Sequence, residues 1–148
     1  MTATTHLAHW VADLDVTTLA PGTREYAKLC LLDTVGIALA GHDEPCTRAA
    51  RTMVQHHGGF PQATLVVTGE RVAAPQAALV NGTASFSHNF TDTTLSCIIH
   101  GGPVAIPAAL AMGEMMGASG AQVLTAIVAG YEVMTRIGNA INAGTARM

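Results

Sequence analysis

The feature that most constrains the fold is a helical spacing of apolar residues, repeated in segments that proline and glycine separate. Near the start of the chain, apolar side chains recur every three or four positions, at Leu7, Trp10, Val11 and Leu14. Because one helical turn takes about 3.6 residues, this spacing predicts a helix over about residues 5–14. The same reasoning predicts further helices over about residues 23–40, 45–57, 74–86, 104–116 and 121–139. The predicted fold class is therefore all-α, a mainly helical bundle.

The segment over residues 23–40 is apolar on more than one face. One face carries Tyr26, Leu29, Cys30, Asp33 and Ile37, and neighbouring leucines and a valine widen it. A helix that is apolar all round is normally buried. We therefore expect this helix to lie at the centre of the core.

One segment departs from the helical pattern. Residues 63–67 form a short run rich in β-branched side chains, and Thr68-Gly69-Glu70 follows it as a turn signal. Short runs of this kind bounded by turn residues are typical of strands. The sequence therefore predicts one short β-hairpin around residues 63–72.

The composition is unusually apolar for a chain of this size. Hydrophobic residues make up 49% of the 148 residues and charged residues 11%, whereas soluble domains carry about 25% charged residues. A small domain has a high ratio of surface to volume, so it should need more charge than this. The simplest interpretation is a homodimer or higher oligomer in which another subunit covers part of the apolar surface.

Charge and hydropathy exclude two classes of partner. The net charge is −3 and Lys28 is the single lysine, so no basic stripe is present to neutralise the phosphates of a nucleic acid. The longest apolar stretch, around residues 104–116, is interrupted by Pro107 and Glu114. It is too short and too broken to span a bilayer. We expect neither nucleic acid nor membrane as a partner.

The cysteines indicate a reducing compartment. Cys30, Cys46 and Cys97 are odd in number and show no CxxC spacing. A disulfide framework normally uses an even number at regular spacings. A cytoplasmic location is therefore the natural expectation.

Most of the side chains that could carry chemistry lie in one polar segment, from His88 to His100. It holds two histidines, an aspartate, an asparagine, a thiol and several hydroxyl groups between apolar helices. Such groups must find hydrogen-bond partners or line a cavity. We take this segment as the candidate chemical centre.

The spacing of the histidines, Asp92 and Cys97 in this segment matches no compact metal motif, and the chain has no GxGxxG or P-loop pattern. No metal or cofactor is therefore expected.

Within this segment two residues are the main candidates for catalysis. His100 precedes Gly101 and Gly102, which would let a ligand approach the backbone closely, and a histidine can move a proton near neutral pH. Alternatively, His100 is a loop histidine bonded to a backbone carbonyl. Asp92 could orient His100 or bind a substrate group. Its alternative role is that of an Asx-turn or helix-capping aspartate.

Several motifs of the chain resemble a known family. They are Leu-Leu-Asp-Thr-Val-Gly at residues 31–36, Ala-Ala-Leu-Val-Asn-Gly-Thr-Ala at 77–84, Pro-Ala-Ala-Leu-Ala at 107–111, Gly-Ala-Ser-Gly at 117–120 and Ala-Gly-Tyr-Glu-Val at 129–133. Together they resemble the N-terminal helical domain of MmgE/PrpD proteins. That family includes 2-methylcitrate dehydratase, cis-aconitate decarboxylase and iminodisuccinate epimerase. The resemblance covers nearly the whole chain.

The resemblance also extends to the polar segment, with departures. The family loop usually reads His-x-x-Asp-Phe-Asp-Asp-Thr, followed by a His-Pro-Gly-like turn. His100, Asp92 and Thr93 match this pattern, whereas Asn89 and Thr91 stand where the family has aspartates. A histidine of the family pattern is also replaced, by Phe86. The first family aspartate is linked with substrate binding and acid–base work, and an amide at this position cannot act as a general base.

The resemblance implies an active site shared between domains. Typical members are much longer and carry a second α/β domain, and basic residues from that later part bind the substrate carboxylates. For the present chain we expect a single helical domain over residues 1–148 without the α/β domain. It would be either an excised or truncated piece of a longer protein or a natural short protein.

Two functions remain open at this point. The first is an enzyme that moves a proton next to a carbonyl or carboxylate of a small polar or carboxylate-bearing substrate, as a dehydratase-like lyase or a diverged epimerase or cyclase. His100 would be the acid/base, Asp92 would orient it, and the substrate would be held by Asn89, Thr93 and His88. The alternative is a non-catalytic, degenerate subunit that dimerises or docks on a full-length homologue. A ligand-binding module without chemistry is a third reading.

Overall fold

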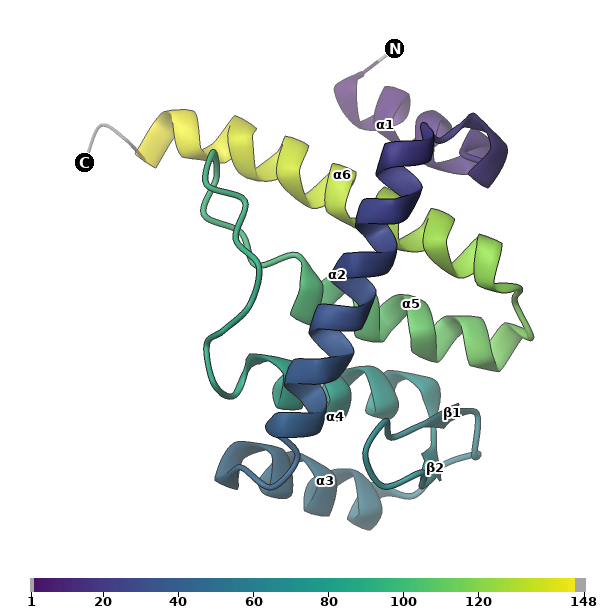
Figure 1. The fold of residues 1–148 in the computed structure, drawn as a ribbon, viewed down its shortest axis with the longest axis vertical. Coiled ribbons are helices and arrows are strands. Elements are labelled where there is room, and N and C mark those ends of the chain that lie inside the picture. The colour runs from purple at the N-terminus through teal and green to yellow at the C-terminus, as the bar shows by residue number, and fades with distance from the viewer. Residues whose placement is uncertain (1, 146–148) are drawn as a thin grey trace.

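The chain folds into a helical bundle with a small hairpin at one end (Figure 1). A computed structural model describes the backbone of residues 2–145 and the side chains of residues 2–141. The elements in chain order are α1 (Ala3–Asp13), the 3-10 helix η1 (Val16–Thr18), α2 (Pro21–Ala40), α3 (Pro45–His57), β1 (Ala63–Thr64), β2 (Arg71–Val72), α4 (Ala74–Phe86), α5 (Gly102–Met116) and α6 (Gly120–Thr145). The predicted all-α class and the short hairpin are both confirmed.

Proline and glycine set most of the helix ends. Four helices, α2 to α5, carry proline at their first or second position, where its missing N–H needs no partner. Glycine ends α3 at Gly58 and α5 at Gly117, with φ of 64° and 63° respectively. These φ values favour glycine because it has no Cβ. Helix α5 begins two residues before the predicted start, at Gly102, so that Pro103 lies in its first turn.

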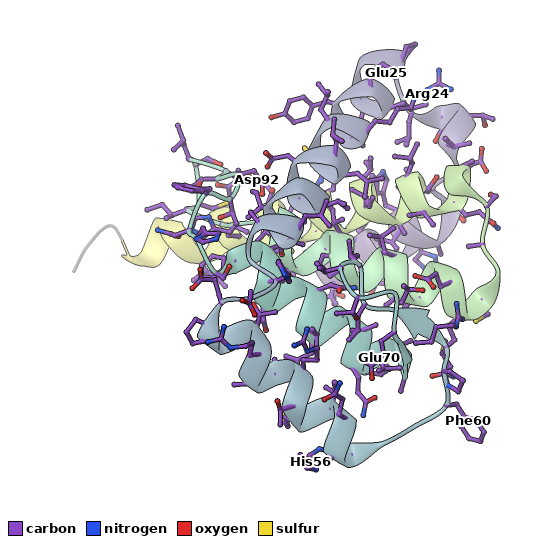
Figure 2. All side chains as sticks on the ribbon, turned by 60° about the horizontal axis from the view of Figure 1, so that its bottom comes forward. Arg24, Glu25, His56, Phe60, Glu70 and Asp92 are labelled. Carbon is purple, nitrogen blue, oxygen red and sulfur yellow. The ribbon has the colours of Figure 1, made fainter. Side chains whose placement is uncertain are left out.

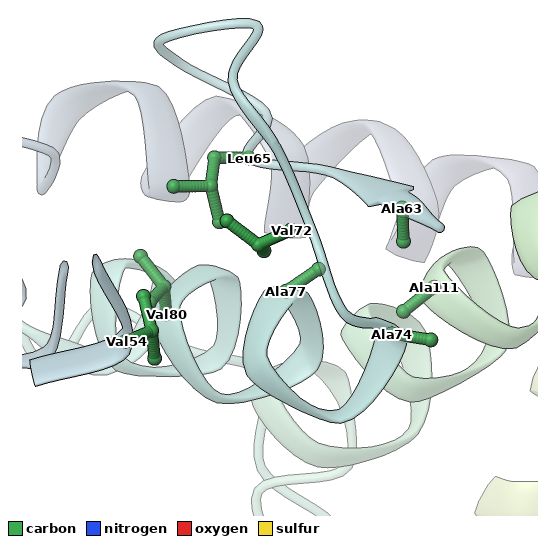
Figure 3. Close-up of a cluster of buried hydrophobic side chains, with 8 residues drawn as sticks. All are labelled: Val54, Ala63, Leu65, Val72, Ala74, Ala77, Val80 and Ala111. Atoms are coloured by element: carbon green, nitrogen blue, oxygen red, sulfur yellow. The ribbon is translucent and has the colours of Figure 1, made fainter. Parts of the chain in front are cut away.

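The hairpin and the helices beneath it share one core cluster. Strands β1 and β2 pair antiparallel, with Ala63 opposite Val72. Figure 3 shows Leu65 and Val72 above the small side chains of α4. The cluster comprises Val54, Ala63, Leu65, Val72, Ala74, Ala77, Val80 and Ala111, which are all nearly inaccessible to solvent. The hairpin thus packs its buried side chains against α4, together with Val54 of α3 and Ala111 of α5.

A second cluster joins α2, α5 and α6. Its buried members are Leu19, Ala27, Ile106, Ile127 and Val128. Figure 1 shows α2 running across α4, α5 and α6, and it contacts all three. This arrangement brings the start of α5 beneath α2 and beside α6, which matters for the site described below.

The expectation that α2 is buried all round is wrong for its outer face. Only Ala27, Thr34 and Ala38 are buried on this helix. The small inner residues allow α2 to approach its neighbours closely, and the large side chains are left outside. We call the exposed set Tyr26, Leu29, Leu32 and Leu39 the α2 outer face; these residues are 48–70% accessible.

Among the described residues, no helix combines the length and hydropathy that a membrane span requires.

Candidate active site

The candidate site lies in the loop between α4 and α5, at residues 87–101. Thr94 and Ile99 form an antiparallel bridge, with the Thr94 N–H donating to the Ile99 carbonyl at 2.9 Å. The bridge closes a small hairpin whose tip exposes Leu95 and Ile98. This hairpin rests on α6, because a Cβ at Gly138 would collide with the side chains of Ile99 and Cys97. The loop is thereby held between α4, α5 and α6.

His100 is half-buried and is held through one ring nitrogen. Its Nδ1 lies 3.1 Å from the Asp92 carbonyl oxygen, 2.9 Å from Thr91 Oγ1 and 3.1 Å from Thr93 Oγ1. A carbonyl oxygen only accepts, and we therefore assign the tautomer in which Nδ1 carries the proton and donates it to the Asp92 carbonyl. The other nitrogen, Nε2, then has a free lone pair. It makes no polar contact with any side chain or main-chain group among the described residues.

Asp92 contacts His100 through its main chain and contacts α5 through its side chain. Its Oδ1 accepts a hydrogen bond from the Gly102 N–H at 2.9 Å. The N-cap residue, Gly101, has no side chain to cap the helix, so this carboxylate does so from ten positions upstream. Figure 2 shows Asp92 where the loop passes beside α2. The carboxylate thus has the capping role considered as the alternative, and the contact with His100 comes from the carbonyl.

Gly101 and Gly102 are buried, and protein side chains occupy the space above them. A Cβ at Gly101 would lie 2.5 Å from the ring of Tyr131. A Cβ at Gly102 would lie 2.6 Å from both Asp92 Oδ1 and Thr34 Oγ1. The expectation that these glycines admit a ligand to the backbone is therefore wrong. They are needed because side chains from α2, α6 and the loop pack directly against the start of α5.

His100 lines an open cleft of about 820 Å³. The lining residues come from α3, α4, the loop, α5 and α6, and are Cys46, Thr83, Phe86, Ser87, Asn89, Ile99, His100, Pro103, Val104 and Met134. The Phe86 ring meets the His100 ring edge-on, with centroids 5.4 Å apart. None of these lining residues is a lysine, arginine, aspartate or glutamate, so the cleft is largely apolar and His100 is its principal base.

The structure brings only some of the predicted site residues together. Asn89 lines the cleft with His100, and its φ of 54° is a conformation that asparagine tolerates better than most residues. Thr93 and Asp92 contact His100 but do not line the cleft. His88 lies elsewhere: its ring stacks on Phe90 and lines a separate groove of about 350 Å³ along α2.

Two other groups of residues at the site could not be predicted from the sequence. Cys46 and Met134 reach the cleft from α3 and α6, and nothing in their local sequence indicates this. Tyr131 lies behind the cleft, where burial, followed by the neighbouring Asp92 carboxylate, raises its pKa. Burial also raises the pKa of the nearby Cys30 thiol.

Among the described residues, no three histidine, cysteine, aspartate or glutamate side chains gather as a metal site would require.

Comparison with known proteins decides the family. The model of the MmgE/PrpD N-terminal domain matches residues 5–147. The chain belongs to the MmgE/PrpD family. The motif-based resemblance is thus confirmed across nearly the whole chain.

Two curated relatives of this MmgE/PrpD chain come from Aspergillus fungi. The cis-aconitate decarboxylase-like protein oryM of Aspergillus oryzae is 25% identical over 145 residues, which cover 93% of this chain and 30% of the relative. The cis-aconitate decarboxylase of Aspergillus terreus is 27% identical over 146 residues, covering 93% and 29%. The chain therefore spans less than a third of the length of the curated relatives it matches.

Proposed function

We propose that this chain carries the histidine of an MmgE/PrpD-type small-molecule enzyme, in which His100 moves a proton at a carbon next to a carbonyl or carboxylate. The observation that carries the proposal is the difference in hydrogen bonding between the two ring nitrogens of His100. In the assigned tautomer Nδ1–H donates to the Asp92 carbonyl, and Nε2 of this cleft-lining residue has no polar partner in the part of the chain that the structure describes. A neutral imidazole whose Nε2 lone pair is free can accept a proton from a substrate carbon.

The contacts around His100 also favour the protonated product of that step. Thr91 and Thr93 place two hydroxyl oxygens at Nδ1 beside the Asp92 carbonyl. An imidazolium formed at Nε2 keeps these three oxygen contacts, which stabilise its charge. Asn89 lines the same cleft, and its amide can donate to a carbonyl or carboxylate oxygen of a substrate. The reaction class is a lyase, as in a dehydratase or decarboxylase, or an isomerase or cyclase.

The neutral lining of the cleft bears on the substrate. A carboxylate bound there meets no cationic side chain among the lining residues. A buried carboxylate needs a cation or several hydrogen-bond donors. We infer that cations that strengthen the binding of a carboxylate-bearing substrate come from another domain or subunit, as the family resemblance implies, so that the chain alone binds such a substrate weakly and is tested at high substrate concentration.

Proton exchange with solvent gives a direct test. The chain is incubated in D2O with cis-aconitate, chosen because relatives bear that name, and with saturated di- and tricarboxylates. Deuterium uptake next to a carboxylate is followed by NMR. We expect uptake by the unaltered chain, loss of uptake in His100→Gln, and no change in the control His57→Gln, whose ring bonds the Met53 carbonyl. Unchanged uptake in His100→Gln would show that His100 is not the base.

The second candidate is a non-catalytic subunit that forms a homo-oligomer or docks on a full-length homologue. The α2 outer face favours it, because Leu29 and Leu32 are 60% and 70% accessible and lie on one side of a helix. Native mass spectrometry of the chain, alone and mixed with a full-length homologue, measures both forms of assembly. We expect Leu32→Glu to abolish any assembly through this face. A monomeric chain that shows deuterium uptake by itself would refute the helper role.

A further inference from the structure

Three elements converge on the first residue of α5. Around Gly102 lie Asp92 Oδ1 from the loop, Thr34 Oγ1 from α2 and the Tyr131 hydroxyl from α6, which lie 2.6 Å, 2.6 Å and 3.3 Å from the position a Cβ would take. The ring of the same tyrosine packs against Gly101. Tyr131 is therefore in contact with both residues that follow His100. A side chain in this position can control where the His100 loop lies.

The Tyr131 hydroxyl is buried and has no hydrogen-bond partner among the described residues. A buried hydroxyl without a partner is costly, so such groups are rare in stable proteins. Burial and the adjacent Asp92 carboxylate both raise the pKa of this phenol, which keeps it protonated and able to donate. The acceptor best suited to it is that carboxylate, because a charged acceptor makes the stronger hydrogen bond.

Resting on the proposed function, we propose that Tyr131 is a positioning residue for His100 that acts through Asp92. In this proposal the Tyr131 hydroxyl turns to donate a hydrogen bond to the Asp92 carboxylate beside it, and this bond restrains the carboxylate against the Gly102 N–H. The carbonyl of the same aspartate then stays aligned with His100 Nδ1, at 3.1 Å. Fixing one end of a single residue limits the rotation of its other end. Tyr131 thereby maintains the tautomer in which Nε2 is free to accept a proton.

The test reads the tautomer of His100 directly. Two-bond proton–nitrogen correlation spectra of the ¹⁵N-labelled full chain distinguish Nδ1–H from Nε2–H in each histidine ring. Comparison with His100→Gln assigns the His100 signals. Tyr131→Phe removes the hydroxyl and keeps the ring that packs on Gly101. Tyr26→Phe is the matched control, because Tyr26 is 67% accessible on the α2 outer face.

We expect His100 to be the Nδ1–H tautomer in the unaltered chain and in Tyr26→Phe. In Tyr131→Phe and in Asp92→Ala we expect a measurable Nε2–H population, with deuterium uptake into substrate slowed about tenfold through kcat and little change in KM. If both variants keep the unaltered tautomer while circular dichroism shows a normal fold, the positioning role is overturned. An unaltered chain that lacks deuterium uptake refutes the proposed function, whereas the tautomer comparison still decides the role of Tyr131.

Discussion

Replacing Asp92 measures how strongly one carboxylate holds the site loop on α5. Asp92→Ala removes the acceptor of the Gly102 N–H, which is buried and lacks a cap from Gly101. A buried donor left without a partner costs about 1–3 kcal/mol, and loss of a helix cap costs about 0.5–2 kcal/mol. These values describe the same contact, so we expect a loss of about 2 kcal/mol. Asp92→Asn keeps an oxygen acceptor and loses only the charge near the helix N-terminus, which costs about 0.5 kcal/mol.

Urea unfolding followed by circular dichroism separates the two variants of Asp92. With a slope of about 2 kcal/mol per molar urea, the alanine variant should lower the midpoint by about 1 M, and the asparagine variant by about a quarter of that. Leu95→Ala, at the exposed tip of the same loop, serves as a control for loop substitution. If Asp92→Ala shifts the midpoint by no more than Asp92→Asn, then the carboxylate does not cap α5 and the reasoning about the loop is wrong.

Three further predictions follow from burial and close packing. Gly101→Ala should destabilise the fold by about 1–3 kcal/mol, because the added Cβ meets the Tyr131 ring. Gly36→Ala should stabilise the fold by about 0.5–1 kcal/mol, because open space surrounds Gly36 within α2. Thermal unfolding compares the two variants, and equal effects on stability would contradict the packing around Gly101. At pH 8, Cys46 should react with iodoacetamide before Cys30, since Cys46 is exposed and burial raises the pKa of the Cys30 thiol. Peptide mass mapping determines the order of labelling, and faster labelling of Cys30 would be inconsistent with its burial. The free energy of unfolding should fall above about pH 9, because Cys30 and Tyr131 stay protonated in the fold while the same groups in the unfolded chain ionise with pKa values near 9.0 and 10.0. Urea unfolding at a series of pH values measures this fall, and Tyr131→Phe should reduce it above pH 10. An unchanged dependence of the free energy of unfolding on pH in Tyr131→Phe would rule out Tyr131 as its cause.

Local chemistry was sufficient to predict most of the helices and the hairpin. Proline cannot continue a helix from within but fits its first turn, and glycine permits the positive φ that ends one, so Pro45 and Gly58 bound α3 nearly as expected. The hairpin around residues 63–72 was also visible, because its strand and turn signals lie within ten residues. Features of this kind depend on backbone restrictions acting over a few neighbouring positions.

The sequence could not tell which face of α2 is buried. Apolar residues surround this helix, so periodicity alone predicted burial all round. The structure selects the face of Ala27, Thr34 and Ala38, where small side chains allow the closest approach to α4, α5 and α6. Close packing between helices depends on the shapes of both surfaces, and one segment carries only half of that information.

The site shows the same division between local and tertiary information. The spacing of the polar loop and its family pattern placed His100, Asp92 and Thr93 in one segment, and the structure keeps them in contact. Only tertiary packing decided that the Asp92 carboxylate turns to α5, that His88 turns away to α2, and that Tyr131 lies behind the pair of glycines. The physical reason is that these contacts join elements far apart in the chain. Their geometry is set by how the helices pack, which no local pattern of residues specifies.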